Sequence, residues 1–224
     1  MSVFPALKTS FPFKWAEEIQ RRFSKMIITH DCLPYKIRSV AGVDVSYLGD
    51  YSYGGAVVLE YPTMKVIEQA TSMRKTVIPY VPTFLAFREL PAAVDAAWKL
   101  KTRPDVFVVD GHGQAHPRRF GLACHFGLAL NAPTIGVAKN ILCGEVKSSE
   151  GCCWMPIVDG DEVIGAAVFT RPSGKPVYVS VGHKISLETA IKVILDCAKG
   201  YRIPEPLRQA HMLAEKAKQK STYA

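Results

Sequence analysis

Residues 41–61 of the chain read AGVDVSYLGDYSYGGAVVLEY, and this stretch indicates the class of fold. Val43, Val45 and Tyr47 alternate with small or polar residues, a pattern that is typical of a β-strand. The Gly49-Asp50 pair predicts a turn, and a second strand is expected to follow it. Because the connection is short, the two strands are expected to pair as antiparallel neighbours.

The residues around this stretch extend the pattern in both directions. We expect the first strand over 37–47 and the second over 53–61. A third strand is expected over 65–76, after a turn at residues 62–64. Three strands joined by such short turns form an antiparallel sheet.

Downstream of these strands, helices alternate with strands. Residues 82–100 predict a helical region that Pro91 interrupts, and we expect a second helical segment to start at this proline. The apolar run 106–109 predicts a strand that is covered on both faces. The remaining expected elements are helices over 120–130, 186–198 and 207–219 and strands over 134–138, 154–158, 163–169 and 177–181.

The order of the first elements is three strands, a helix, a strand, a helix and a strand, which is the layout of ribonuclease-H-like proteins. We therefore expect an α/β fold in which a mixed β-sheet lies between helices. Three antiparallel strands should come first and parallel strands should follow them. The sequence shows no internal repeat and no linker, so residues 1–224 are expected to form a single domain.

The composition excludes several classes of protein. A chain of 224 residues with 48% hydrophobic residues can bury a large core and is too apolar to be disordered. No apolar run approaches the ~20 residues that a membrane span needs, and the N-terminus does not resemble a secretory signal. The six cysteines form no ligand-spaced set, which favours reduced thiols in a cytoplasmic protein over a zinc site.

The net charge of +8 is concentrated at the two ends of the chain. Residues 1–39 and 199–224 form basic arms with a net charge of +4 each, and the segment between them is neutral. Basic arms commonly bind phosphate backbones, although such charge can also serve solubility alone. The first arm includes a predicted helix over 13–27, whose apolar residues at helical spacing are Trp15, Ile19, Phe23, Met26 and Ile27.

Three carboxylates occur where acidic residues are unusual. Asp44 lies inside an apolar strand, Asp110 ends the buried run, and Glu89 lies within the helical region. A carboxylate at the C-terminal end of a buried strand faces the crevice in which open α/β sheets bind ligands. Such groups suit Mg²⁺, which prefers oxygen ligands and can activate water for phosphoryl chemistry. In the alternative interpretation, Asp110 caps a turn and Asp44 pairs with an arginine.

The loop after the buried strand is rich in residues with special properties. Gly111 and Gly113 allow a substrate to approach the backbone closely, and His116 adds a titratable donor. Arg118 and Arg119 can contact phosphate groups. The two histidines of this loop are not expected to form a zinc pair, because its glycines and proline oppose the helix that such a pair needs.

Residues 79–82, Pro-Tyr-Val-Pro, predict a stiff turn that carries an aromatic ring. Tyr80 in this turn can stack on bases or wedge between them. An ordinary turn with a core tyrosine explains the same residues equally well.

Together these motifs resemble the endonuclease V family. The resemblance extends from about Arg38 to His211, which is most of the chain. Motifs of this length in this order are highly specific. They are residues 41–44, 79–82, 84–89, 109–113, 116–119, 125–127, 134–139, 182–183 and 201–206.

The resemblance implies a ribonuclease-H-like DNA repair endonuclease that depends on Mg²⁺, or on Mn²⁺ in its place. Its substrate would be nucleic acid with a deaminated base such as deoxyinosine. The cut would fall at the second phosphodiester on the 3′ side of that base and leave 3′-hydroxyl and 5′-phosphate ends. Asp44 and Asp110 would hold the metal, and Glu89 would complete its site, partly through water. Lys139 would contact the scissile phosphate or a neighbouring one.

The resemblance also assigns the residues that receive the base. Tyr80 and Pro82 would belong to a wedge that fills the gap left by a flipped base, and the loop glycines would accept the base through backbone groups. We expect His116 and His211 to take part in catalysis; His211 matches a histidine near the metal in part of the family. Thr83 stands where many members have glycine; this departure either alters the base preference or leaves it unchanged, if the amide of Thr83 serves equally well.

We expect the protein to act as a monomer on DNA that contains deoxyinosine or another deaminated base, without a membrane partner. Inosine-containing RNA is a further expected substrate, and an inosine-specific ribonuclease is one alternative function. A non-catalytic reader of deaminated nucleic acid is another, but a pure binder does not need the set of Asp44, Glu89, Asp110 and Lys139. An incision domain of a larger excision nuclease would depend on partner proteins, which a compact single domain does not suggest.

Overall fold

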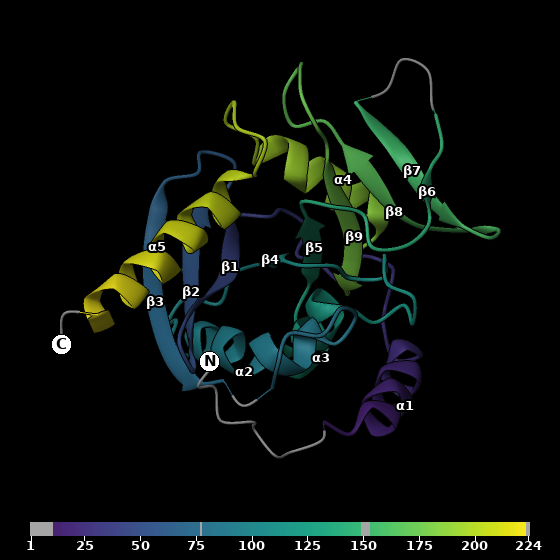
Figure 1. Cartoon of the computed structure of the whole chain (residues 1–224). Helices are drawn as coiled ribbons and strands as arrows, with labels where there is room; N and C mark the ends of the chain where they lie inside the picture. The colour runs from purple at the N-terminus through teal and green to yellow at the C-terminus, as the bar shows by residue number, and fades with distance from the viewer. Residues whose placement is uncertain (1–10, 77, 149–152, 223–224) are drawn as a thin grey trace.

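The computed structural model of the protein describes residues 11–76, 78–148 and 153–222. In this part of the chain, nine strands form one sheet in the order β3-β2-β1-β4-β5-β9-β8-β7-β6 (Figure 1). The strands are β1 Ser39–Leu48, β2 Tyr51–Glu60, β3 Val66–Lys75, β4 Val106–Asp110, β5 Thr134–Ala138, β6 Glu145–Val146, β7 Trp154–Asp159, β8 Glu162–Val168 and β9 Val177–His183. The helices are α1 Phe13–Ser24, α2 Leu85–Trp98, α3 Leu122–Leu130, α4 Leu187–Asp196 and α5 Glu205–Thr222.

Three parallel strands form the centre of the sheet. β4 pairs in parallel with β1 on one side and with β5 on the other. β1, β2 and β3 form the antiparallel ladder that the opening stretch predicts. The expected mixed sheet is therefore confirmed, although only β4 and β5 are the parallel strands that follow; β9, β8, β7 and β6 return to antiparallel pairing.

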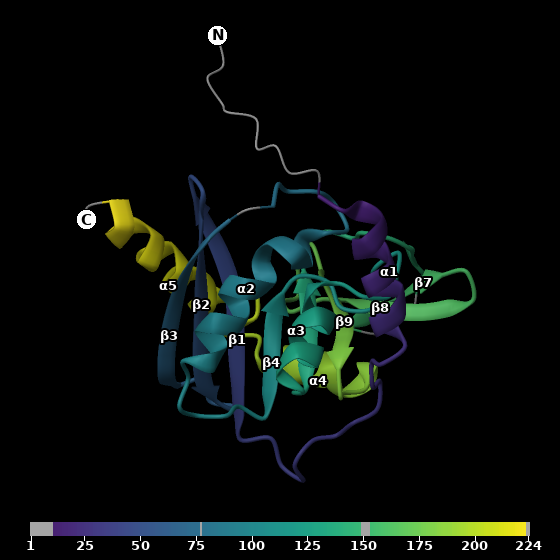
Figure 2. The same cartoon turned by 90° about the horizontal axis from the view of Figure 1, so that it is seen from below.

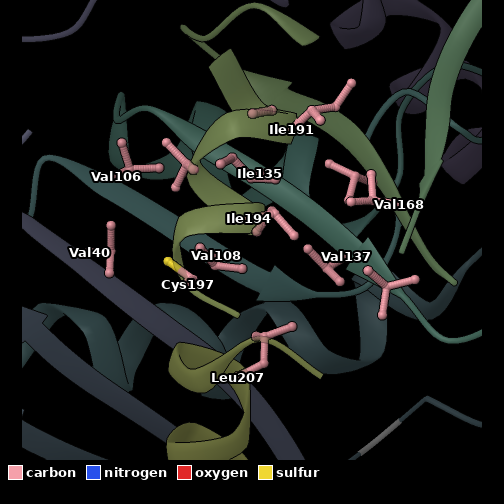
Figure 3. Packing of buried hydrophobic residues seen from close by; sticks show 14 of the residues in the cluster. Val40, Val106, Val108, Ile135, Val137, Val168, Ile191, Ile194, Cys197 and Leu207 are labelled. Carbon is pink, nitrogen blue, oxygen red and sulfur yellow. The ribbon is translucent and has the colours of Figure 1, made fainter. Parts of the chain in front are cut away.

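Helices cover both faces of the sheet, as a ribonuclease-H-like fold requires. α4 and α5 cover one face and α2 and α3 cover the other, with α1 beside α3 (Figures 1 and 2). Because neighbouring residues of a strand point to opposite faces, Val40 and Val108 belong to the core under α4 and α5 (Figure 3). Ala41 and Val109 belong to the core under α2 and α3. The two hydrophobic cores, one on each face of the sheet, hold β1 and β4 in a fixed position relative to each other.

The basic C-terminal segment includes α5, which packs against β1 and β2. Leu207 and Ala210 are buried on its inner face. Gly42 in β1 makes this close packing possible, because a Cβ atom at Gly42 would lie 1.9 Å from the carbonyl oxygen of Pro206. Removing the segment would therefore uncover part of the core.

Gly42→Ala is expected to destabilise the protein, because the added methyl group meets backbone atoms that have no flexible end to move away. We expect the free energy of unfolding in urea to fall by about 1–3 kcal/mol, the usual cost of overpacking. Gly49→Asn is a suitable control, since a Cβ there meets no atom within 4 Å and asparagine tolerates the φ of 54°. A Gly42→Ala variant as stable as the wild type would contradict the close packing of α5.

The prediction that a second helical segment starts at Pro91 is wrong. α2 continues through Pro91 without a break. Proline has no N–H group, so the helix lacks the hydrogen bond to the carbonyl group of Phe87. The buried alanines of α2 pack on the sheet and stabilise the helix despite this loss; they are Ala86, Ala92, Ala93, Ala96 and Ala97.

α1 does not bury the face that its apolar residues predict. Trp15 is exposed and Ile19 is only partly buried. The helix ends at Ser24, so Met26 and Ile27 of the predicted helix lie beyond it. The buried residues of this helix are Ala16 and Gln20. The polar side chain of Gln20 is therefore buried where α1 packs on the rest of the protein.

The short strand β6 has no counterpart among the elements that the sequence predicts. Within the described residues, no helix is long and apolar enough to cross a membrane. The five cysteines in this part of the chain are free thiols, and Cys152 lies outside it.

Candidate active site

Asp44 and Asp110 lie next to each other at one edge of the sheet. β1 and β4 are parallel with Val43 opposite Val109, so the residues that follow this pair are also neighbours. Asp44 is only 9% exposed, and the side chain of Asp110 is 18% exposed. Burial and then repulsion by Asp110 raise the pKa of Asp44 to about 6. Two acids in such contact favour a cation between or beside them.

Glu89 reaches the same edge of the sheet from α2. It is buried, and its Oε1 accepts a hydrogen bond of 2.8 Å from the hydroxyl group of Tyr47. Burial raises the pKa of Glu89 to about 8; the Tyr47 hydrogen bond opposes this shift, and the charges of Asp44 and Asp110 add to it. The three predicted carboxylates therefore form one electrostatic cluster.

Two basic side chains face these acids. Nζ of Lys139, just after β5, donates a hydrogen bond of 2.6 Å to Oδ2 of Asp110. Burial opposes the charge of Lys139, but attraction to the carboxylates outweighs it and raises the pKa of the lysine. His211 on α5 places Nδ1 2.7 Å from Oδ2 of Asp44. The partner of Asp44 is thus a histidine, and the arginine pair of the alternative interpretation is not formed.

The carboxylate cluster fits a hard divalent cation. Among the described residues, no group of three or more His, Cys, Asp or Glu side chains could hold a metal ion by itself. Mg²⁺ does not need such a group, because proteins usually bind it through one or two carboxylates together with water and substrate phosphates. Asp44 and Asp110 supply this kind of donor pair, because they are neighbours across β1 and β4 and their charges repel each other.

A pocket of about 350 Å³ opens beside the carboxylates. Asp110 and Lys139 line it together with residues of three other segments. The other lining residues include Gln20, Tyr80, Pro82, Thr83, Gly111, His112, His116 and Leu122. Pockets for small molecules span roughly 300–1,000 Å³, so this volume suits one group of the size of a base.

Tyr80 lines the pocket but is 66% exposed, which excludes the core tyrosine of the alternative interpretation. The segment before it is anchored by Arg88 on α2, whose guanidinium donates a hydrogen bond to the carbonyl oxygen of Ile78. The same guanidinium lies 4.3 Å from the ring centre of Tyr47, the residue that holds Glu89. The turn and the carboxylate cluster are therefore held by the same helix.

Thr83 adopts a left-handed backbone conformation with φ of 68°. This conformation strains a β-branched residue and explains why glycine suits the position. Four hydrogen bonds hold Thr83 in place. Its carbonyl oxygen accepts from Gln20 Nε2 at 3.0 Å, from His116 Nε2 at 2.9 Å and from Arg118 Nη2 at 3.2 Å, and its hydroxyl oxygen accepts from the same Nη2 at 2.5 Å.

His116 and Arg118 are engaged with this turn. Nδ1 of His116 accepts a hydrogen bond from the backbone N–H of Arg118, so the neutral ring carries its proton on Nε2. Burial lowers the pKa of His116 to about 4, which keeps the ring neutral. The side chain of Arg118 is 10% exposed and is directed toward Gln20 and Thr83. The catalytic role of His116 and the phosphate contact of Arg118 stay predictions.

The two loop glycines have different surroundings. Gly111 lines the pocket next to Asp110 of the carboxylate cluster. Gly113 does not line it; a Cβ there would lie 2.0 Å from the carbonyl oxygen of Val181, so this glycine allows the loop to pack against β9. Arg119 forms ion pairs with Asp159 and Glu162 and does not face the pocket.

Sequence reasoning missed two residues of this site, Tyr47 and Gln20. For Tyr47 a signal was available, because it shares a strand face with Ala41 and Val43, and this face packs under α2. For Gln20 the sequence offers no signal, since its partners lie 63 to 100 positions away.

A ribonuclease-H-like sheet that carries clustered carboxylates and a lysine beside the C-terminal ends of β4 and β5 is the framework of a nuclease, and this protein is one. The endonuclease V family profile matches residues 21–212, and the chain belongs to this family. It is 45% identical to endonuclease V of Thermofilum pendens over 209 residues, which are 93% of this chain and 90% of the relative.

Solved structures agree with this assignment. The crystal structure of endonuclease V from Streptomyces avermitilis matches with a TM-score of 0.88 and 37% identity, over 98% of each chain. Endonuclease V of Ciona intestinalis, in complex with a 24mer DNA containing an inosine followed by a ribo-adenosine, matches with a TM-score of 0.84 and 35% identity. That match covers 93% of this chain and 97% of the other.

Proposed function

We propose that the protein is a metal-dependent endonuclease that acts in DNA repair on strands with deoxyinosine or another deaminated base. The cut falls at the second phosphodiester on the 3′ side of that base and leaves 3′-hydroxyl and 5′-phosphate ends. Mg²⁺ is the cofactor, and Mn²⁺ can substitute for it. One observation carries the proposal: the cluster of Asp44, Asp110 and Glu89 adjoins a pocket of base size that is lined by the exposed Tyr80.

Each polar residue of the cluster has a role in this proposal. Asp44 and Asp110 hold the metal ion, which neutralises phosphate charge and activates water when it is bound. His211 orients Asp44 through their 2.7 Å contact. Glu89, fixed by the Tyr47 hydroxyl group, binds water at the edge of the cluster. Nζ of Lys139, which now contacts Asp110, can turn to a phosphate oxygen of the bound strand.

The pocket receives the flipped base, and the ring of Tyr80 fills the gap that the base leaves in the stack. His112 lines this pocket, and its buried Nδ1 has no hydrogen-bond partner among the described residues. Burial lowers the pKa of His112 to about 4, so the ring meets the base as a neutral group. An unpartnered buried nitrogen is costly, which supports the binding of a polar group at this pocket.

A second candidate function is cleavage of inosine-containing RNA. The strand bound to the Ciona intestinalis relative has a ribo-adenosine after the inosine, so that enzyme accommodates a 2′-hydroxyl group at this place. A non-catalytic reader is disfavoured, because four ionisable groups of a hydrolytic site are gathered in one cluster. We also propose that residues 1–224 form a single domain that acts as a monomer.

The direct test is to incubate the protein with four labelled strands of one sequence. The strands are DNA or RNA, and each carries either one inosine or an adenosine at the same position. Cleavage of the inosine strands in Mg²⁺ but not in EDTA supports the proposal, and the ratio of the DNA and RNA rates identifies the preferred substrate. Absence of cleavage in all four strands, or equal cleavage of the adenosine controls, would contradict it.

Binding is expected to weaken steeply with salt, partly through α5. Lys216 and Lys220 are exposed on this helix, which also carries His211. In the Lys216→Gln/Lys220→Gln variant, the slope of log K against log salt on duplex DNA should fall by about 0.9 for each phosphate that the helix no longer neutralises. Fluorescence anisotropy over a range of KCl concentrations measures this slope.

The matched control is Lys65→Gln/Lys101→Gln. These two exposed lysines lie before β3 and β4, outside the two basic arms and at the opposite end of the strands from the carboxylates. Their replacement removes the same charge and should leave the slope unchanged. If the slope of the α5 variant equals that of the wild type, Lys216 and Lys220 contribute to solubility and do not contact phosphates.

A further inference from the structure

Gln20 is a polar residue of α1 that is fully buried. Its Nε2 donates hydrogen bonds to the carbonyl oxygens of Thr83, at 3.0 Å, and of Phe120, at 3.3 Å. Its Oε1 accepts a hydrogen bond of 2.6 Å from Nε of Arg118. Both ends of the carboxamide are satisfied, so the burial leaves no polar atom unpaired. A buried side chain with such distant partners fixes their relative positions.

The two carbonyl groups belong to different walls of the pocket. Thr83 ends the turn that carries Tyr80, and both residues line the pocket. Phe120 stands just before the start of α3, where Leu122 lines another wall. One nitrogen atom of Gln20 therefore links the two walls, and Gln20 itself lines the space between them.

The wall that carries Thr83 needs support, because its φ of 68° is unfavourable for threonine. Gln20 provides this support directly through its bond to the Thr83 carbonyl group. It also acts indirectly, since its Oε1 orients the guanidinium of Arg118 that binds the carbonyl and hydroxyl oxygens of Thr83. Loss of Gln20 thus removes one of the four hydrogen bonds and loosens two more.

We propose that Gln20 is a positioning residue for base selectivity: it holds Thr83 in the left-handed conformation and fixes the two walls of the pocket. α1 is then part of the recognition of the base, although its side chains do not reach the carboxylate cluster. The inference rests on the proposed function and deepens it, because it names the residue that shapes the pocket for the deaminated base.

Gln20→Leu tests the inference, because leucine has a similar size but forms no hydrogen bonds. Selectivity is measured as the ratio of affinities for matched strands with deoxyinosine and deoxyadenosine, by anisotropy in EDTA. We expect this ratio to fall about tenfold, because the direct hydrogen bond to Thr83 is removed together with those to Phe120 and Arg118. Cleavage of saturating inosine strand in Mg²⁺ should change much less, since the carboxylates are untouched.

A second substitution separates positioning from a general structural role. Glycine adopts positive φ without strain and needs no support at position 83. Thr83→Gly in the Gln20→Leu background should therefore restore the selectivity to within about twofold of the Thr83→Gly single variant. Gln209→Leu on α5 is the matched control and should leave the selectivity unchanged. Should Gln20→Leu fail to fold, Gln20→Glu replaces it, because glutamate still accepts from Arg118 but cannot donate to Thr83.

The outcomes distinguish this inference from the proposed function. A wild type that binds both strands equally would overturn the proposed function, and the inference with it. A wild type that prefers inosine, with a folded Gln20 variant that prefers it equally, would overturn only the inference. A loss of selectivity that Thr83→Gly does not restore would also overturn it, because Gln20 would then act on the fold and not on Thr83.

Discussion

Asp110→Asn is expected to slow cleavage of inosine-containing DNA on the order of 10³-fold or more, while the strand still binds. The register of β1 and β4 places Asp110 beside Asp44, and Lys139 contacts its Oδ2. The amide has the same size but no negative charge, so it is a poor ligand for Mg²⁺. Binding should persist or become stronger, since one negative charge near the phosphates is removed. Single-turnover rates in Mg²⁺ and anisotropy measure the two effects.

Asp161→Asn is the control for this experiment. Asp161 is exposed in the turn between β7 and β8, so the same chemical change there should leave the cleavage rate unaltered. Retained binding by Asp110→Asn shows that the variant is folded. A cleavage rate of Asp110→Asn near that of the wild type would show that Asp110 is not a ligand of the metal ion.

Tyr80→Ala is expected to impair recognition more than chemistry. Extraction of a base leaves a gap in the stack, and an aromatic ring in this gap recovers part of the lost stacking energy. Base–aromatic stacking contributes ~1–3 kcal/mol per base, so the affinity for the inosine strand should fall ~5- to 150-fold. The cleavage rate of saturated substrate should fall much less, because the carboxylates lie on other elements. A fluorescent base analogue beside the inosine reports directly whether the gap is filled.

Tyr35→Ala provides the comparison, since Tyr35 is a fully exposed tyrosine in another segment of the chain. This variant should bind and discriminate as the wild type does. If Tyr80→Ala also keeps the affinity and the preference for inosine over adenosine, the ring of Tyr80 does not enter the stack.

The fold could be predicted where the determinants are local. The alternation in β1 and β2 and the short turns between them specify antiparallel pairing without further information. The error at Pro91 arose because packing of the alanine face of α2 outweighs the local preference of proline. The error in α1 has a similar cause. The spacing of the apolar residues predicted a buried Trp15, but the helix buries Gln20, whose side chain forms hydrogen bonds with distant segments.

The same distinction applies to the candidate site. Asp110 could be expected at the ligand crevice, because it ends a buried strand. Asp44 lies beside it in the middle of β1, because β1 and β4 pair in parallel with Val43 opposite Val109. The approach of His211 from α5 came from the resemblance to the family and not from any local pattern. The network around Thr83 depends on side-chain contacts between distant segments, which no sequence pattern reports. For Tyr47, the alternation of the strand indicates the face under α2 but not the hydrogen bond to Glu89.

In the proposed function, the carboxylate cluster and the base pocket act on one strand at a fixed separation. This separation can be measured with a series of DNA strands in which a single deoxyinosine moves along the sequence one position at a time. In Mg²⁺, we expect one cut per strand, always at the second phosphodiester on the 3′ side of the inosine, with a 5′-phosphate on the downstream product. A cut that stays in place while the inosine moves, or cuts at variable distances from it, would contradict the fixed separation and with it the proposed function.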